Sequence, residues 1–105
     1  SVHTNRIPGH PECFGAQTFY HPSSEEGKRL AELVQEELLK IDTENYRSAL
    51  PGDYRVLRLS KMPGVIVEIG FMTNERDRRL IATETYRDRV ADAVVRGAIR
   101  FFTGR

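Results

Sequence analysis

The chain has 105 residues, which is enough for one small domain with a single core. Its 16 Lys and Arg and 15 Asp and Glu give a formal net charge of +1, so no global electrostatic attraction to nucleic acid or to an acidic membrane is expected. No apolar run approaches the roughly 20 residues of a transmembrane helix. The single cysteine excludes an internal disulfide.

The first part of the chain predicts two short strands and one helix. Residues 1–5 favour a strand that is followed at once by an irregular loop over residues 6–15, which contains proline and glycine. Residues 16–20 have the alternation and the aromatic content of a strand. Ser23 and Glu26 have the spacing of a capping box, which predicts that a helix begins there. The apolar stripe of this helix consists of Leu30, Leu33, Val34, Leu38 and Ile41.

The middle of the chain predicts a surface connection and two further strands. Residues 42–53 are polar and rich in turn formers, with a short strand or helical turn expected near Tyr46. Residues 54–60 alternate between apolar and polar side chains, which predicts a strand with one polar face. Residues 65–69 are apolar and β-branched except for Glu68, as in a strand that is buried on both faces.

The last part of the chain predicts a helical turn and a long helix. Asn74 can cap the turn, with Asp77 at the third position. The long helix is expected to start near Thr85, with Asp88 three residues further on, and to stop at Gly104. Strands and helices interleaved in this way favour an α/β fold in which helices cover a mixed central sheet, and all of them fit in one domain.

Glu68 is the first candidate for chemistry. A carboxylate that is withdrawn from water without partners costs several kcal/mol, so such a group is paired with a cation, associated with a metal, or protonated. The strand ends shortly after Glu68, and strand ends of α/β folds are the usual place for catalytic groups. A structural ion pair with Arg55 or Arg58 is the competing interpretation, and position alone does not separate the two.

His3 is the second candidate, in the first predicted strand and just before an irregular loop. A neutral imidazole is the commonest protein ligand for zinc. Asn5 would point to the same side of an extended strand, where it could orient the imidazole or bind substrate. A lone histidine is more often an ordinary surface or core residue, so His3 has no assigned role by itself.

The remaining reactive side chains indicate no second chemistry. The segment His10–Cys13 contains ligand-type side chains, but no second Cys/His pair exists to complete a structural zinc site. Its thiol has no obvious activating base in the sequence. Neither Ser23 nor Ser60 stands in a Gly-x-Ser-x-Gly segment. The arginines from Arg76 onward lie among acidic residues, which predicts a solvated helix face with intrahelical pairs.

Three segments that occur in the right order carry a family resemblance. They are Ser-Val-His-Thr-Asn at residues 1–5, Gly-Ala-Gln-Thr-Phe-Tyr at residues 15–20, and Met-Pro-Gly-Val-Ile-Val-Glu-Ile-Gly-Phe-Met-Thr-Asn at residues 62–74. Together they resemble the zinc-dependent N-acetylmuramoyl-L-alanine amidases, which are bacterial cell-wall hydrolases. The second segment is most similar to the sporulation and germination branch, and the third is the most specific. The resemblance spans nearly the whole chain.

The resemblance implies a role for each candidate. The histidine of the family's Ser-x-His-x-Asn segment ligates zinc and corresponds to His3, and the glutamate of its Glu-Ile/Leu-Gly-Phe segment is the catalytic carboxylate and corresponds to Glu68. The family's other two ligands are a His in an Asp-Pro-Gly-His-Gly segment and a Glu after it. Neither has a counterpart here, since His10 stands in the wrong place. We therefore expect residues 1–105 to be the C-terminal part of a single amidase domain, with its N-terminal half absent and its zinc site incomplete.

The resemblance also implies an activity and a location. The intact domain is expected to hydrolyse the amide bond between N-acetylmuramic acid and L-alanine in peptidoglycan, outside the cytoplasmic membrane, in the cell wall or the spore cortex. The alternative is a non-catalytic wall-binding or regulatory module that retains the amidase scaffold. Truncation is expected to uncover a sheet edge and the inner faces of both long helices, so the isolated chain should associate with another copy or be only part of the folded protein.

Overall fold

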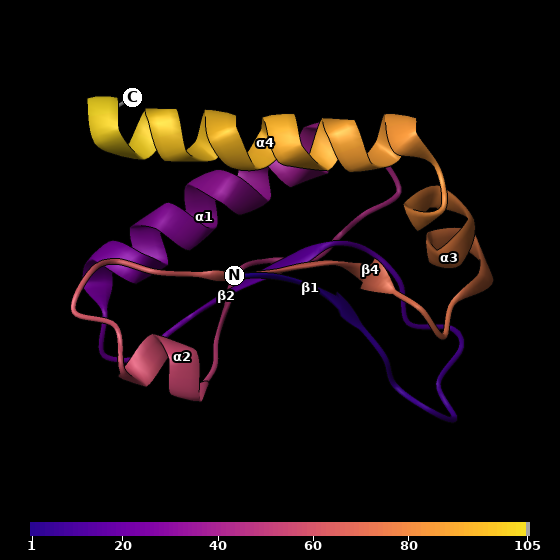
Figure 1. Cartoon of the computed structure of the whole chain (residues 1–105), viewed down its shortest axis with the longest axis horizontal. Coiled ribbons are helices and arrows are strands. Elements are labelled where there is room, and N and C mark those ends of the chain that lie inside the picture. Colours follow the sequence, from indigo (N-terminus) through magenta and orange to yellow (C-terminus); the bar gives the residue numbers. More distant parts are fainter. Residues whose placement is uncertain (105) are drawn as a thin grey trace.

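A four-stranded sheet lies under two long helices in the computed structural model, which describes residues 1–104 (Figure 1). The strands are β1 (Val2–Asn5), β2 (Gln17–Tyr20), β3 (Leu50–Pro51) and β4 (Ile66–Phe71). The helices are α1 (Glu25–Lys40), α2 (Arg55–Arg58), α3 (Glu75–Ile81) and α4 (Glu84–Thr103).

The sheet has the strand order β1-β4-β2-β3 and mixed strand directions. β1 runs parallel to β4, β4 runs antiparallel to β2, and β2 runs parallel to β3. The strand that carries Glu68 is therefore central, although it is the last strand in the sequence, and β1 forms one edge. This arrangement confirms the α/β class with a mixed sheet.

The two long helices lie across one face of the sheet and enclose the core between themselves and β4 (Figure 1). Val34 of α1, Val90 of α4 and Val67 of β4 are buried together in this core. The helices approach so closely at Gly97 that a Cβ atom there would stand 2.7 Å from the Cα atom of Val34. The inner faces of α1 and α4 are therefore covered, and the expectation that they are open is wrong.

Most helix ends follow the capping signals of the sequence with small shifts. The predicted cap at Ser23 is wrong by one residue, because the hydroxyl of Ser24 caps the first turn of α1. Asn74 caps α3 through its side chain, as predicted. The cap of α4 is Thr83, slightly before the predicted start. Gly104 ends α4 with a left-handed φ of 74°, a conformation that favours glycine.

The predicted strand over residues 54–60 is wrong, because this segment forms the short helix α2. Leu57 is buried, whereas Val56 and Leu59 are exposed. Three apolar residues are too few to define a period, so a short alternating segment fits one helical turn as well as a strand. The sheet still has four strands, because the two-residue strand β3 joins it. β3 lies in the connection over residues 42–53, where the sequence predicts a short element near Tyr46.

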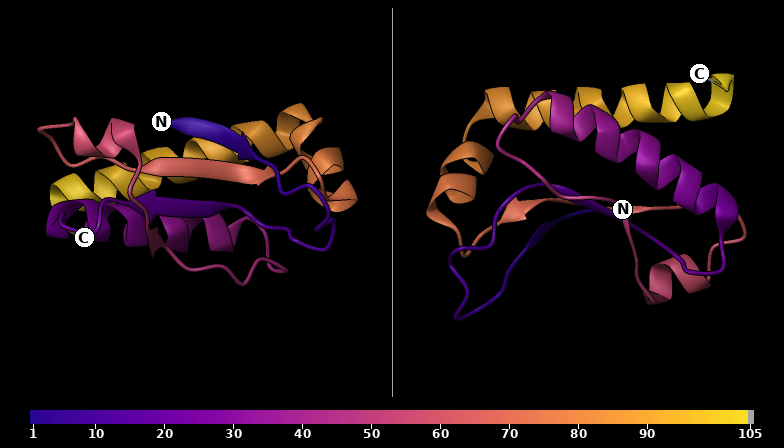
Figure 2. Two further views of the ribbon diagram at one scale, coloured as in Figure 1. Left: turned by 90° about the horizontal axis from the view of Figure 1, so that it is seen from below. Right: turned by 180° about the vertical axis from the view of Figure 1, so that it is seen from behind.

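The other face of the sheet has no helix across β1, β4 and β2 within residues 1–104, as the view from below in Figure 2 shows. α2 lies on this side but beyond one end of β4. Apolar side chains are exposed at Val2 on the edge strand and at Val95, Ile99 and Phe102 on α4. None of the helices in the described part of the chain combines the length and hydropathy of a membrane span.

Candidate active site

Three side chains form a row across the open face of the sheet. His3 of β1 stands in register with Glu68 of β4, and Glu68 stands in register with Gln17 of β2. Residues that lie opposite each other on neighbouring strands project from the same face. Because Val67 packs in the core under α1 and α4, its neighbour Glu68 projects from the open face. The row therefore brings together the two residues that the sequence singles out, and it adds Gln17.

The Glu68 carboxylate lies in this row without a cation within ion-pair distance among residues 1–104. Its Oε2 atom is buried and has no hydrogen-bond partner in the described part of the chain. Burial raises the pKa of Glu68 above its ordinary value, and the nearby His3 opposes this rise. Arg58 pairs with Asp53 at 3.1 Å and not with Glu68. The structural ion pair that competed with a catalytic role is therefore not formed.

His3 lies at the edge of the sheet, where its side chain is exposed. Its Nε2 atom and the hydroxyl of Ser1 share a hydrogen bond of 2.5 Å. Asn5 makes a different contact, since its Oδ1 accepts from the amide of Arg6. The pairing of β1 with β4 also shifts between His3 and Asn5, so the regular alternation of a strand does not hold there. Ser1, and not Asn5, is hydrogen-bonded to the imidazole.

The chemistry of the row suits part of a zinc centre. An exposed imidazole beside a carboxylate with a buried, unpartnered oxygen offers one nitrogen ligand and one proton acceptor. A catalytic zinc ion is held by about three protein ligands. Residues 1–104 contain no group of three or more His, Cys, Asp or Glu side chains that could hold a metal ion. His3 and Glu68 therefore fit such a centre without completing it.

Gln17 is the member of the row that sequence reasoning missed. It is only 5% exposed, and both ends of its amide are bonded. Nε2 donates to the carbonyl of Ser48 at 2.9 Å, and Oε1 accepts from Nη1 of Arg47 at 3.3 Å. The alternation of residues 16–20 places Gln17 on the opposite side of its strand from Ala16, but only the pairing of β2 with β4 shows that it lies beside Glu68.

A buried carboxylate holds the ends of the two strands that carry Glu68 and Gln17. Asp77 of α3 is 2% exposed, and its Oδ2 accepts from the amides of Gly15 at 2.8 Å and Phe71 at 2.9 Å. Gly15 lies just before β2, and Phe71 ends β4. Asp77 therefore joins the start of one strand to the end of the other.

The other two histidines make hydrogen bonds close to their own positions in the chain, and His21 Nε2 also lies 3.7 Å from a carboxylate oxygen of Asp53. His10 Nδ1 lies 2.9 Å from a carboxylate oxygen of Glu12 in an exposed loop. His21 Nδ1 accepts from the amide of Ser23 at 3.1 Å just before α1. Neither histidine belongs to the row.

The C-terminal arginines are only in part a solvated face with intrahelical pairs. Arg79 pairs with Glu75 one helical turn away, as predicted. Arg76 and Arg100 instead pair with acidic residues of other segments, so the prediction is wrong for these two. Their partners outside their own helices are Asp42 and Glu44 for Arg76, and Glu36 and Glu37 for Arg100.

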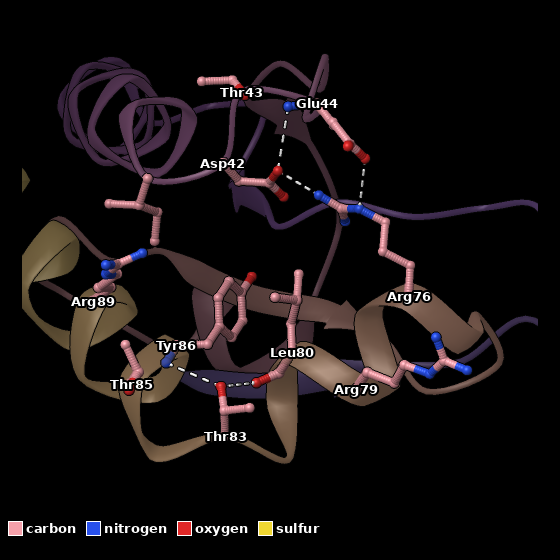
Figure 3. Close-up of a pocket in the computed structure, with 11 residues that line it drawn as sticks. Asp42, Thr43, Glu44, Arg76, Arg79, Leu80, Thr83, Thr85, Tyr86 and Arg89 are labelled. Carbon is pink, nitrogen blue, oxygen red and sulfur yellow. Dashed lines mark hydrogen bonds and ion pairs between the residues drawn. The ribbon is translucent and has the colours of Figure 1, made fainter.

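A cavity of about 580 Å³ lies where α3 and α4 meet the end of α1, away from the row (Figure 3). Tyr86 stands in its wall beside the ion pair of Arg76 and Asp42. The Tyr86 hydroxyl donates to the carbonyl of Ile69 at 2.7 Å, and burial raises the pKa of Tyr86 to about 12. No member of the row lines this cavity, so its size does not make it the candidate active site.

A family model described as N-acetylmuramoyl-L-alanine amidase matches residues 1–100. The chain belongs to the N-acetylmuramoyl-L-alanine amidase family. The germination-specific N-acetylmuramoyl-L-alanine amidase of Bacillus subtilis (strain 168) is 33% identical in an alignment 105 residues long, which covers 98% of this chain and 44% of that amidase.

Solved amidase structures have the same fold. The CwlD amidase from Clostridioides difficile, in complex with the GerS lipoprotein, matches with a TM-score of 0.94 and 33% identity, over 100% of this chain and 54% of that chain. The amidase AmiC2 of Nostoc punctiforme matches with a TM-score of 0.90 and 33% identity, over 98% of this chain and 56% of that chain. This chain therefore spans about half the length of these three amidases.

Proposed function

We propose that this chain supplies the catalytic carboxylate, Glu68, and one zinc ligand, His3, of an enzyme that hydrolyses the amide bond between N-acetylmuramic acid and L-alanine in peptidoglycan. The observation that carries the proposal is the register of His3 with Glu68 beside a buried, unpartnered Oε2 atom. Membership of the amidase family supports the reaction class. In this proposal residues 1–105 are the C-terminal part of the amidase domain, and the other zinc ligands lie outside residues 1–104, since the described residues contain no three-ligand group.

Glu68 transfers one proton in the proposed reaction. Its carboxylate accepts a proton from the attacking water while the water oxygen bonds to the scissile carbonyl carbon. The same carboxyl group returns the proton to the amide nitrogen as the C–N bond breaks, which leaves a lactyl carboxylic acid and the amine of L-alanine; the proton of the acid then passes to the amine. Zinc, when bound, supplies Lewis acidity that polarises the carbonyl and makes water more acidic.

The proposed substrate also sets the location. Peptidoglycan lies outside the cytoplasmic membrane, so we infer an extracytoplasmic protein. The similarity to a germination-specific amidase supports the spore cortex as one place of action.

Replacement of Glu68 by Gln tests the catalytic role. The amide keeps the size of the side chain but cannot take up the proton, so release of free L-alanine amino groups from peptidoglycan should fall by about 10²–10⁴-fold. Zinc content, measured by atomic absorption on the native protein that carries this sequence, should stay at the wild-type level. Glu32→Gln on the exposed surface of α1 is the matched control and should keep full activity. Wild-type turnover in Glu68→Gln would rule out the proposed role.

The competing function is a non-catalytic wall-binding or regulatory module. The lack of a three-ligand group within residues 1–104 is the observation that favours it. Sedimentation with purified peptidoglycan separates the two, because a module binds the wall without releasing amino groups. Binding by zinc-loaded wild-type protein with no amine release would support the module and refute the amidase.

A further inference from the structure

Three arginines within residues 1–104 are half-buried, and they differ in how their charge is balanced. Arg76 pairs with three carboxylates and Arg100 with two. Arg47 has no carboxylate within ion-pair distance in the described part of the chain. Charges that are withdrawn from water are normally paired, because desolvation is costly. Arg47 is therefore the one half-buried cation here whose counter-ion is missing.

The guanidinium of Arg47 is fixed by hydrogen bonds and stacking, but some of its N–H donors have no acceptor among residues 1–104. Its Nε donates to the carbonyl of Phe14 at 2.6 Å, and its Nη1 donates to Oε1 of Gln17 at 3.3 Å. The group also stacks over the ring of Phe71, 4.6 Å from the ring centre. A guanidinium has about five N–H donors, so roughly three are left for a further acceptor. Stacking and hydrogen bonding fix the plane in which those donors lie.

Gln17 places this guanidinium next to the row. Gln17 is bonded to Arg47 on one side and stands opposite Glu68 on the other. Because Gln17 stands opposite Glu68, the two side chains project from the same face of the sheet. No described helix crosses that face at β4 (Figure 2), so a substrate that reaches Glu68 from there passes close to Arg47. A planar pair of N–H donors matches the geometry of a carboxylate.

We propose that Arg47 binds a carboxylate of the peptide whose amide bond Glu68 cleaves, which makes it a substrate-binding residue that selects acidic stem peptides. The inference rests on the proposed function. A stem peptide that begins L-alanyl-D-glutamate carries its first free α-carboxylate one residue beyond the L-alanine of the scissile bond. Amidation of that group to D-isoglutamine removes the charge and leaves the rest of the peptide unchanged.

Two soluble substrates that differ only at the α-carboxylate of the second residue separate the effect of its charge from the effect of the peptide's shape. One is N-acetylmuramoyl-L-alanyl-D-glutamate, and the other is the D-isoglutamine form. In the zinc-loaded protein that carries this sequence, Arg47→Gln should raise KM about tenfold for the glutamate substrate, as expected for loss of a charged hydrogen-bonded pair. It should leave kcat nearly unchanged and KM for the isoglutamine substrate within about twofold. Arg47→Lys keeps the charge and should recover part of the loss.

Arg29→Gln is the matched control. Arg29 also stacks on a phenylalanine, Phe101, and donates to a backbone carbonyl, but it belongs to α1 and contacts α4, and both helices lie on the other side of the sheet (Figure 1). It should leave both KM values unchanged. A second measurement needs no variant: the product dipeptide L-alanyl-D-glutamate should inhibit the wild-type protein about tenfold more strongly than L-alanyl-D-isoglutamine.

The outcomes distinguish this inference from the function on which it rests. If the wild-type protein cleaves neither substrate, the proposed amidase function fails and this inference fails with it. If the wild-type protein is active but shows no preference between the two dipeptides, only the role of Arg47 is refuted. An equal rise in KM for both substrates in Arg47→Gln would also refute the role of Arg47 in binding the carboxylate, because it would show a structural effect that does not depend on the charge of the peptide.

Discussion

Replacement of Asp77 by Asn probes how the strand ends behind the candidate active site are held. The Asp77 carboxylate serves three donors: the amides of Gly15 and Phe71 on Oδ2, and Nη1 of Arg76 on Oδ1 at 2.6 Å. Asparagine has the same shape but keeps only one oxygen, and its NH₂ group is a donor. In either orientation of the amide, a donor must then face a donor inside the protein.

The expected loss in the free energy of unfolding is about 3 kcal/mol. With the amide oxygen toward Gly15 and Phe71, the NH₂ group faces Arg76 and breaks a buried ion pair, which costs about 3–5 kcal/mol. The lower end applies because Arg76 retains two other carboxylates. With the amide flipped, two backbone amides lose a charged acceptor, at about 1.5–3 kcal/mol each. Both orientations therefore predict a loss of the same order.

Urea unfolding followed by far-ultraviolet circular dichroism measures this loss. Asp88→Asn is the matched control, since Asp88 is exposed on α4, and its unfolding free energy should stay within about 0.5 kcal/mol of the wild type. The slope of the transition should be the same in all three proteins, so that the midpoint alone reports stability. A loss below about 1 kcal/mol in Asp77→Asn would refute the argument that its three bonds act together in a buried site.

Two further predictions concern the contact between α1 and α4. Gly97→Ala should lower the free energy of unfolding by about 1–2 kcal/mol in a thermal melt, because overpacking against the backbone of Val34 outweighs the gain in helix propensity; an unchanged or raised melting temperature would contradict this. The hydrogen bond from Lys40, together with Arg100, lowers the pKa of Glu37 below its ordinary value of 4.5. This carboxylate therefore stabilises the fold fully above about pH 4.5, and the contribution is lost as the pH falls through the lower folded-state pKa. Unfolding midpoints between pH 6 and pH 3 should fall more steeply for the wild type than for Glu37→Gln, and equal slopes would show that Glu37 does not contribute.

Local chemistry explains why the sequence predicts so much of this fold. A helix end is signalled by a capping residue within a few residues of the end, as at Asn74 for α3 and at Gly104 for α4. The apolar stripe of a helix is likewise visible within its own segment. Glu68 is identifiable because a carboxylate in an apolar strand is energetically unusual within its own segment. The strand predicted over residues 54–60 is wrong because a pattern so short has no defined period.

Local sequence patterns are enough to predict the fold class, the main helices and the candidate residues Glu68 and His3. Only the tertiary structure decided that His3 and Gln17 flank Glu68 on one face, because strand register joins segments that are far apart in the chain. The same holds for Arg47, whose lack of a carboxylate partner among residues 1–104 is seen only when the carboxylates around it have positions. The sequence shows that a charged residue such as Glu68 stands among apolar neighbours in the chain. Whether a charged side chain has an ion-pair partner depends on residues that are distant in the chain and close in space.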